Sequence, residues 1–244
     1  MKIAIVGYGR MGKLVEDYAK KRGHEIAIII DPIYNTSKEN LLNTEFDVII
    51  EFSIPGAAME NMKFYAENNM KVVMATTGWY DKVEEIKELF KKSNGAILWS
   101  SNFSLGVHLF WKMIENAGKI INNFDDYDVF GHEFHHNKKA DSPSGTAITT
   151  ANIILDNVDR KKELITEELK HRAIKPEELH FSSTRGGNIP GTHSVYFDSL
   201  FDTIKIEHTA RTREGFALGS VVCAEWLNKK TGYYEISDFV KEII

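Results

Sequence analysis

The sequence predicts an α/β protein in which a doubly wound parallel sheet with helices on both faces is joined to an α+β domain with a mixed sheet. Three observations predict this fold. Over the first hundred residues, short runs rich in β-branched residues alternate with segments of helical spacing. After residue 102 this alternation stops. Three strand-like runs then follow one another without intervening helices, which is typical of an antiparallel or mixed sheet.

Five strands are expected in the first hundred residues. Each is a short apolar run that ends at a glycine, a proline or a small polar residue, and they cover residues 2–6, 25–30, 46–52, 71–75 and 96–100. The helices between them are predicted from apolar residues at helical spacing. The first begins near Met11 and ends at Gly23, Pro55 opens the second, and residues 81–92 form a charged amphipathic third.

The second half of the chain has a different pattern. Its predicted helices cover residues 105–121, 144–155 and 215–228, and its predicted strands cover residues 127–134, 179–185, 193–197 and 203–210. We place a domain boundary near Ser104 and expect the chain to re-enter the first domain near Glu214. The expected domains are therefore residues 1–104 plus 215–244, and residues 105–214.

Composition limits the classes of function. The 244 residues are 43% hydrophobic and 27% charged, and 30 basic against 35 acidic residues give a net charge of −5. This balance argues against a nucleic-acid partner, which usually requires a basic face, but not against a small anionic ligand. Cys223 is the single cysteine and lies in an apolar run, so we expect a buried core residue in a reducing cytoplasm. No signal peptide or membrane-spanning run is recognised, and we expect a cytoplasmic protein.

A glycine motif follows the first predicted strand and opens the first predicted helix. It reads Gly7-Tyr8-Gly9-Arg10-Met11-Gly12 and has the G-x-G-x-x-G spacing of a dinucleotide-binding loop in a Rossmann domain. Gly7 permits the tight turn, Gly9 lets the backbone approach the pyrophosphate, and Gly12 lets helix and strand pack closely. The phosphates would sit at the helix N-terminus, where free amides and the helix dipole favour anions. This context favours a glycine loop that binds a nicotinamide or flavin cofactor over a glycine loop with a purely structural role.

The residue at the end of the second predicted strand bears on the choice of cofactor. Asp31 follows Gly12 by 19 residues and would accept hydrogen bonds from the adenosine ribose. Its carboxylate would repel the 2′-phosphate of NADPH, and Pro32 stands where an arginine could otherwise hold that phosphate. Lys38 and Arg10 could still assist such a phosphate. The sequence therefore favours NADH and leaves NADPH use open.

Two further strand ends are expected at the same edge of the sheet, where ligands of doubly wound sheets collect. They combine small residues with hydrogen-bonding groups, and are Ala75, Thr76 and Thr77 after the fourth strand and Ser100, Ser101, Asn102 and Phe103 after the fifth. Simple turn chemistry explains these residues equally well.

The segment that begins at His132 matches H-E-x-x-H, the pattern of zinc proteases. That pattern binds zinc only on a helix, and residues 127–130 lead into it as a strand. On a strand, His132 and His136 would lie roughly 13 Å apart, too far for one metal ion. We therefore expect no metal site.

The residues that follow suit an anionic substrate that must accept a proton. Pro143 can precede a helix, and Ser144 is a plausible N-cap. Gly145 and Thr146 would then offer free amides to a carboxylate. Lys139 and either His135 or His136 would project towards the same place from the preceding loop. The alternative is a capped helix after a solvated polar loop, but this concentration of donors favours a functional site.

At this point the chain resembles the 4-hydroxy-tetrahydrodipicolinate reductase (dihydrodipicolinate reductase) family of bacterial lysine and diaminopimelate synthesis. The most specific likeness is Glu133-x-His-His-x-x-Lys-x-Asp-x-Pro-Ser-Gly-Thr-Ala147. The resemblance spans nearly the whole chain, through the glycine loop, Glu51-Phe-Ser-x-Pro55, Ala75-Thr-Thr-Gly78, Ser101-Asn-Phe-Ser-x-Gly106, Arg185-Gly-Gly187 and Phe216-Ala-x-Gly219. The glycine loop is shorter than in some members, and Pro32 replaces the arginine of dual-cofactor members.

The resemblance implies a reductase that acts on a cyclic dicarboxylate with NADH or NADPH, and a homotetramer built by the sheet of the second domain. It implies that His135 is the acid/base, Lys139 the proton donor and His136 a substrate ligand, with Gly145 and Thr146 holding a carboxylate. The cofactor positions fall on residues 7–12, Asp31, residues 75–77 and residues 100–103.

Two rival functions remain open. A different amino-acid dehydrogenase on the same scaffold would keep the glycine loop but has no need of the paired histidines. A module that only senses the dinucleotide would bind NADH without turnover.

Overall fold

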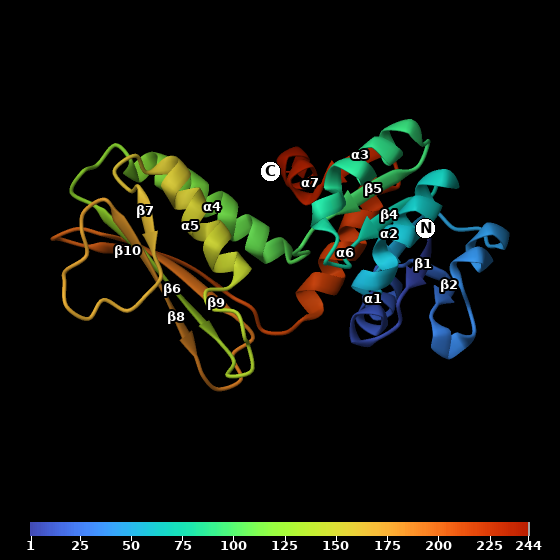
Figure 1. The fold of residues 1–244 in the computed structure, drawn as a ribbon, viewed down its shortest axis with the longest axis horizontal. Helices are drawn as coiled ribbons and strands as arrows, with labels where there is room; N and C mark the ends of the chain where they lie inside the picture. The colour runs from blue at the N-terminus through green and yellow to red at the C-terminus, as the bar shows by residue number, and fades with distance from the viewer. Residues whose placement is uncertain (244) are drawn as a thin grey trace. The chain divides into compact units, whose positions relative to one another are not determined.

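The computed structural model describes residues 1–243, which form two compact units (Figure 1). One unit contains Met1–Ser104 and the chain from Glu214 onward, and the other is Leu105–Arg213. The chain therefore leaves the first unit after its fifth strand and returns to it for its last elements.

The first unit contains a six-stranded parallel sheet in the order β11-β5-β4-β3-β1-β2. The strands are β1 (Lys2–Val6), β2 (Glu25–Ile30), β3 (Val48–Glu51), β4 (Lys71–Met74), β5 (Ala96–Trp99) and β11 (Gly232–Glu235). The central strands are almost wholly buried, which explains why they are continuous apolar runs and not alternating ones.

Helices cover this sheet and close its core. They are α1 (Arg10–Lys21), α2 (Pro55–Glu67), α3 (Val83–Lys92), α6 (Glu214–Leu227) and α7 (Ile236–Ile243), with short 3₁₀ turns η1 (Pro32–Tyr34), η2 (Lys38–Asn43) and η3 (Tyr80–Lys82). Helix α1 buries Gly12, Val15 and Ala19, which recur at helical spacing on one face. Helix α6 packs against α1 and against strands β3, β4 and β5. The C-terminal elements thus complete the first unit.

The second unit has a five-stranded sheet in the order β10-β9-β6-β8-β7. Its strands are β6 (Asp128–His135), β7 (Glu163–Ile165), β8 (Glu178–Arg185), β9 (Thr192–Asp198) and β10 (Thr203–Thr209). Pairs β6–β8 and β7–β8 are parallel, whereas β6–β9 and β9–β10 are antiparallel, so the sheet is mixed. Helices α4 (Leu105–Ile121) and α5 (Gly145–Asn157) lie together on one face of it (Figure 1).

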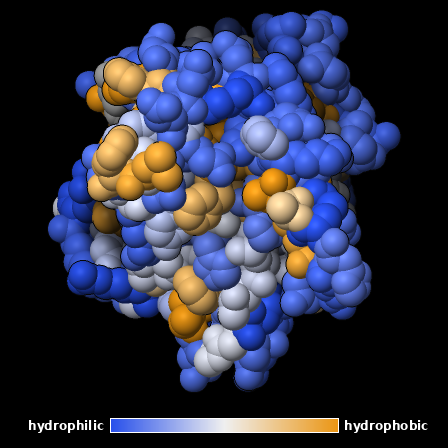
Figure 2. All heavy atoms as spheres, turned by 90° about the vertical axis from the view of Figure 1, so that its left-hand side faces the viewer, coloured by the Kyte–Doolittle hydropathy of each residue, from blue (hydrophilic) through white to orange (hydrophobic). Residues whose placement is uncertain are grey.

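The opposite face of this sheet has no helix among the described residues. Along β6 the burial alternates, so that Glu133 and His135 point to the helix side while Phe130 and Phe134 remain partly exposed. The ring of Phe130 stacks on Tyr196 of β9 at a centroid distance of 4.9 Å. Figure 2, which turns the left-hand side of Figure 1 to the viewer, shows hydrophobic residues interspersed with polar ones.

The predicted fold class is confirmed, with most strand and helix ends within one or two residues of expectation. Some features were not predicted. Strand β7 has only three residues, and β11 reads Gly-Tyr-Tyr-Glu, without the buried apolar run that marks the other strands of its sheet. Helix α7 follows β11 directly, the helix expected over 81–92 begins as the 3₁₀ turn η3, and the turns η1 and η2 were not expected. Cys223 is fully buried, as expected. Among residues 1–243, no helix combines the length and the apolar character that crossing a membrane requires.

Candidate functional site

The glycine loop of the first unit has the geometry that its sequence predicts. Gly7 has a φ of +84°, and a Cβ there would lie 2.4 Å from the carbonyl oxygen of Phe52. A Cβ on Gly12 would lie 2.3 Å from the carbonyl oxygen of Gly7, so strand and helix approach at a distance that only glycine allows. A Cβ on Gly9 would meet no atom within 4 Å. The backbone at Gly9 is therefore open to a ligand.

Two cavities open on this loop, with volumes of about 650 and 300 Å³. The larger is lined by the predicted residues Gly7, Tyr8, Gly9 and Asp31. The smaller is lined by Gly9, Arg10, Met11, Ala75, Thr76 and Thr77. The structure thus brings together predicted residues from the ends of three strands. An open glycine backbone at a helix start, between two hollows, fits a dinucleotide.

The carboxylate of Asp31 is held in place beside the larger cavity. Its Oδ2 accepts a hydrogen bond from the Tyr8 amide at 2.7 Å, and its Oδ1 accepts one from the Ile33 amide at 3.0 Å. Lys38 lines the same cavity, but it forms an ion pair with Glu60. The acidic group is thus fixed, while the nearby cation is already paired.

Ser53 was not predicted as a site residue, although it lines both cavities. Its amide donates to the Thr76 hydroxyl at 2.8 Å, which ties the loop after β3 to the loop after β4. The available signal was its place between a buried strand and the helix-opening Pro55.

The Ser100–Phe103 segment, which was predicted to contact the cofactor, forms a turn of its own at the end of β5. Ser100 exchanges hydrogen bonds with the backbone of Asn102 there, and Phe103 is buried.

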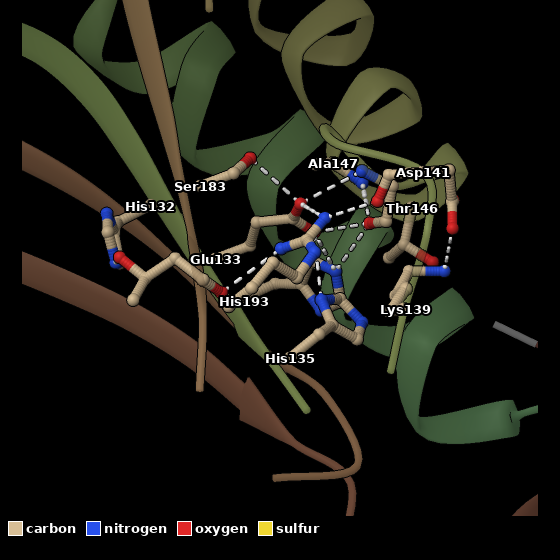
Figure 3. Close-up of polar contacts among 12 residues, drawn as sticks. His132, Glu133, His135, Lys139, Asp141, Thr146, Ala147, Ser183 and His193 are labelled. Carbon is tan, nitrogen blue, oxygen red and sulfur yellow. Dashed lines mark hydrogen bonds and ion pairs between the residues drawn. The ribbon is translucent and has the colours of Figure 1, made fainter. Parts of the chain in front are cut away.

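The second unit concentrates polar groups around Glu133, whose side chain is fully buried (Figure 3). Its Oε1 accepts hydrogen bonds from the Ser144 amide at 2.9 Å, the Ser183 hydroxyl at 2.9 Å and the Arg185 guanidinium at 2.8 Å. Its Oε2 accepts from the Ser144 hydroxyl and lies 3.3 Å from His193 Nε2. Burial alone would raise the pKa of Glu133, but the contacts with His193, Ser144 and Arg185 outweigh it and bring the pKa well below its usual range.

His135 points to the same side of β6 as Glu133. Its Nδ1 lies 3.2 Å from Glu133 Oε2, and its side chain is 9% exposed. Burial lowers the pKa of His135 to about 4, although the neighbouring Glu133 carboxylate opposes that change. The imidazole is therefore neutral at neutral pH.

Lys139 lies in the loop between β6 and α5. Its Nζ is 2.8 Å from Asp141 Oδ1, and this contact lowers the pKa of the Asp141 carboxyl. The Lys139 side chain is 24% exposed, which leaves it accessible to a ligand. Within the described chain, the buried Nδ1 of His136 has no hydrogen-bond partner. Figure 3 shows Lys139 and Thr146 on the α5 side of Glu133.

Helix α5 begins as predicted. Ser144 is its N-cap, and the Ser144 side chain accepts a hydrogen bond from the Ala147 amide at 3.2 Å. No group in residues 1–243 accepts the amides of Gly145 or Thr146. Two amides at the start of a helix therefore remain for an anion.

The H-E-x-x-H pattern forms no zinc-protease site, because its first four residues lie on strand β6 and not on a helix. His132 points to the face of β6 opposite Glu133, where it contacts Ser182 and Thr184 (Figure 3). Candidate ligand atoms of Glu133, His135 and His193 do lie within 4.8 Å of one another. However, the Glu133 oxygens already accept hydrogen bonds from Arg185, Ser144 and Ser183, so we assign no metal chemistry to this group.

Sequence reasoning did not place Arg185 or His193 in this cluster. His193 pairs with Glu133 across β9, and Arg185 pairs with His135 across β8. Both lie at least 50 positions from these partners in the sequence, so no local spacing could reveal them. Only strand register brings them to the site.

Comparison with known proteins agrees with this geometry. The N-terminal model of dihydrodipicolinate reductase matches residues 1–103, and its C-terminal model matches residues 106–240. The chain belongs to the dihydrodipicolinate reductase family. A 4-hydroxy-tetrahydrodipicolinate reductase from Christiangramia forsetii is 40% identical over 243 residues, which cover 100% of this chain and 99% of the relative. One from Archaeoglobus fulgidus is 35% identical over 264 aligned positions, which cover 99% and 100%.

Solved structures share the fold of this family member. A dipicolinate-bound dihydrodipicolinate reductase from Paenisporosarcina sp. aligns with a TM-score of 0.79 at 21% identity, covering 96% of this chain and 97% of the other. A meso-diaminopimelate dehydrogenase variant from Clostridium tetani aligns with a TM-score of 0.56 at 14% identity, covering 97% and 94%.

Proposed function

We propose that this chain reduces 4-hydroxy-tetrahydrodipicolinate to tetrahydrodipicolinate with a nicotinamide dinucleotide, in the diaminopimelate route to lysine. Membership of the reductase family supports the reaction. The observation that carries the assignment is the cation of Lys139 in the loop that leads to a helix start with two open amides. A reaction that transfers a proton to a bound dicarboxylate requires both a proton donor and a group that binds a carboxylate.

The substrate carboxylates are held by the start of α5. The amides of Gly145 and Thr146 donate to one carboxylate, where the helix dipole also favours negative charge. The unpartnered Nδ1 of His136 supplies a further polar contact. These groups fix the ring so that the carbon that receives hydride is correctly oriented.

Lys139 delivers the proton. Water is lost from the hydroxylated ring to leave a conjugated imine, and negative charge develops towards its nitrogen when C4 accepts hydride. An ammonium group at that end stabilises the charge and transfers its proton. A pKa of about 4 keeps the His135 ring neutral at neutral pH, so it does not act there as an imidazolium acid. It therefore serves as an acceptor or as a neutral donor that orients the substrate.

The first unit would hold the cofactor. Its pyrophosphate would lie on the loop from Gly7 to Gly12, and its other parts would lie along residues 75–77 and 100–103. The bound dinucleotide supplies the hydride. Asp31 would accept the ribose hydroxyls and repel a 2′-phosphate, and Lys38 is paired with Glu60. NADH is therefore the preferred cofactor, with NADPH the weaker one.

The open face of the second sheet supports a homotetramer. Phe130 and Phe134 of β6 are partly exposed on that face, where the ring of Phe130 stacks on Tyr196. Exposed aromatic side chains on a sheet face that no helix covers are typical of a subunit contact. Light scattering would report the mass of four chains.

The single buried cysteine supports a location in the reducing cytoplasm.

The decisive experiment follows NADH absorbance with enzymatically generated 4-hydroxy-tetrahydrodipicolinate. We expect a steady loss of absorbance with this substrate, and none with aspartate semialdehyde alone. Oxidation of homoserine or aspartate with NAD, without turnover of the ring, would instead identify an amino-acid dehydrogenase. Tight NADH binding with no turnover of any of these compounds would identify a sensing module.

A further inference from the structure

Glu133 has no role in proton or hydride transfer as described above, although it is a fully buried carboxylate beside the groups that would hold the substrate. Burying a charge is unfavourable unless several hydrogen bonds compensate. Glu133 has such compensation from Ser183 and Arg185, which belong to β8, and from Ser144, which caps α5. One carboxylate thus joins the strand that carries His135 to a neighbouring strand and to a helix start.

We propose that Glu133 is a positioning residue, which fixes the start of α5 and the ring of His135 so that they are ready to receive a dicarboxylate. This inference rests on the proposed function and extends it to a residue that does not itself contact substrate.

The first line of support is the arrangement of donors at the helix start. Glu133 accepts both the amide and the hydroxyl of Ser144, and the Ser144 oxygen then accepts the Ala147 amide. Together these bonds use the amides on either side of Gly145 and Thr146, whose own amides are left for a ligand. A lone carboxylate here would compete with an anionic ligand for the helix N-terminus. The Arg185 guanidinium, 2.8 Å away, offsets its charge.

The second line of support is the confinement of His135. Its Nδ1 lies 3.2 Å from Glu133 Oε2 on one side. On the other side, a Cβ added to Gly191 would lie 2.9 Å from His135 Nε2. The ring is therefore confined between the carboxylate and the backbone of the loop before β9. A shift of the carboxylate would release the ring as well as the helix start.

Glu133→Asp tests the proposal because it keeps the charge but withdraws the carboxylate by one methylene, about 1.5 Å. Glu178→Asp is the matched control. Glu178 is also buried in the second unit, and it is paired with Arg172 at 2.6 Å and with the Lys175 amide at 2.9 Å, but at the opposite end of β8. Both substitutions shorten a buried, guanidinium-paired glutamate of the same sheet.

The readout is calorimetric binding of dipicolinate in the presence of NADH, together with NADH binding and melting temperature. We expect the dipicolinate Kd of Glu133→Asp to rise between about tenfold and a hundredfold, while its NADH Kd stays at the parental value. The Glu178→Asp protein should keep the parental Kd for both ligands, whatever its melting temperature. A purely structural role would lower the melting temperature without separating the two Kd values.

The proposal is overturned if Glu133→Asp binds dipicolinate as tightly as the parent, or if Glu178→Asp weakens it equally. If Glu133→Asp does not fold, Ser144→Ala replaces it, with an expected rise in Kd of about fivefold; an unchanged Kd again overturns the proposal. Parental turnover is measured first. Its absence would refute the proposed function, whereas parental turnover with unaltered dipicolinate binding in the variant refutes the positioning role alone.

Discussion

Replacement of His135 by glutamine should remove a pH-dependent loss of stability. Burial brings the pKa of His135 to about 4, compared with 6.5 for an unperturbed histidine. The unfolded chain therefore binds a proton before the folded protein does. As pH falls below about 6.5, protonation favours unfolding, and the folded state loses stability until the pH reaches about 4.

The size of this loss follows from the two pKa values. At about 1.4 kcal/mol per pKa unit, the difference between 6.5 and about 4 amounts to about 3 kcal/mol. Because the His135 side chain is only 9% exposed, solvent screens little of this free energy. Glu133 has a lowered pKa, so its contribution is present above the unfolded value of 4.5 and is lost mainly below it. That contribution is common to parent and variant.

The assay is urea unfolding of the parent and of His135→Gln at several pH values from 7 to 4, at one fixed protein concentration. The free energy of unfolding of the parent minus that of the variant should fall by about 3 kcal/mol over this range. His171→Gln, at an exposed position, is the control for the loss of a histidine as such. A difference between parent and His135→Gln that stays constant from pH 7 to pH 4 would refute the reasoning.

Three further results are expected. Lys139→Ala should lower kcat by a factor of about 10²–10³ with little change in NADH affinity, because one positioned cation is lost; a near-parental rate in the absorbance assay would exclude Lys139 as the proton donor. Asp31→Asn should shift the ratio of NADH to NADPH Kd by about tenfold towards NADPH, and an unchanged ratio would mean that its charge does not select the cofactor. Gly131→Ala should destabilise the fold by about 1–3 kcal/mol, since its Cβ would lie 2.3 Å from the Phe181 ring, whereas Gly186→Ala, with no atom within 4 Å, provides the control in urea unfolding.

Much of the first unit could be predicted because its signals are local. A β-branched run, a glycine turn and an amphipathic helix follow one another from Lys2 to Lys21, and each has a recognisable local sequence pattern. Asp31 follows from the same logic, as the residue that ends the second strand. Strand β11 (Gly232–Glu235) escaped prediction because it has no buried apolar run, unlike the equally short β3, β4 and β5, and because it joins the sheet by pairing with β5, far away in the sequence.

The candidate site of the second unit could be predicted only in part. The loop from His135 to Thr146 was recognised because its donors are consecutive in the sequence. The ion-pair network beneath it was not, because Glu133 meets Arg185 and His193 through strand register, and a sequence without strand pairing does not show which residues lie side by side. Burial also changed the chemistry of His135 from a titrating group to a neutral one, which residue type alone does not reveal.

The return of the chain to its first unit has a consequence for synthesis on the ribosome. Strand β5 obtains its outer neighbour β11, and α1 obtains its partner α6, only from residues that are translated last. When residue 213 has been translated, the second unit (Leu105–Arg213) is complete, whereas the first unit still lacks the elements from Glu214 onward. The inserted unit can thus mature first during translation, and an early stop after residue 213 would leave the nascent Rossmann half with bare apolar surface for chaperones to shield.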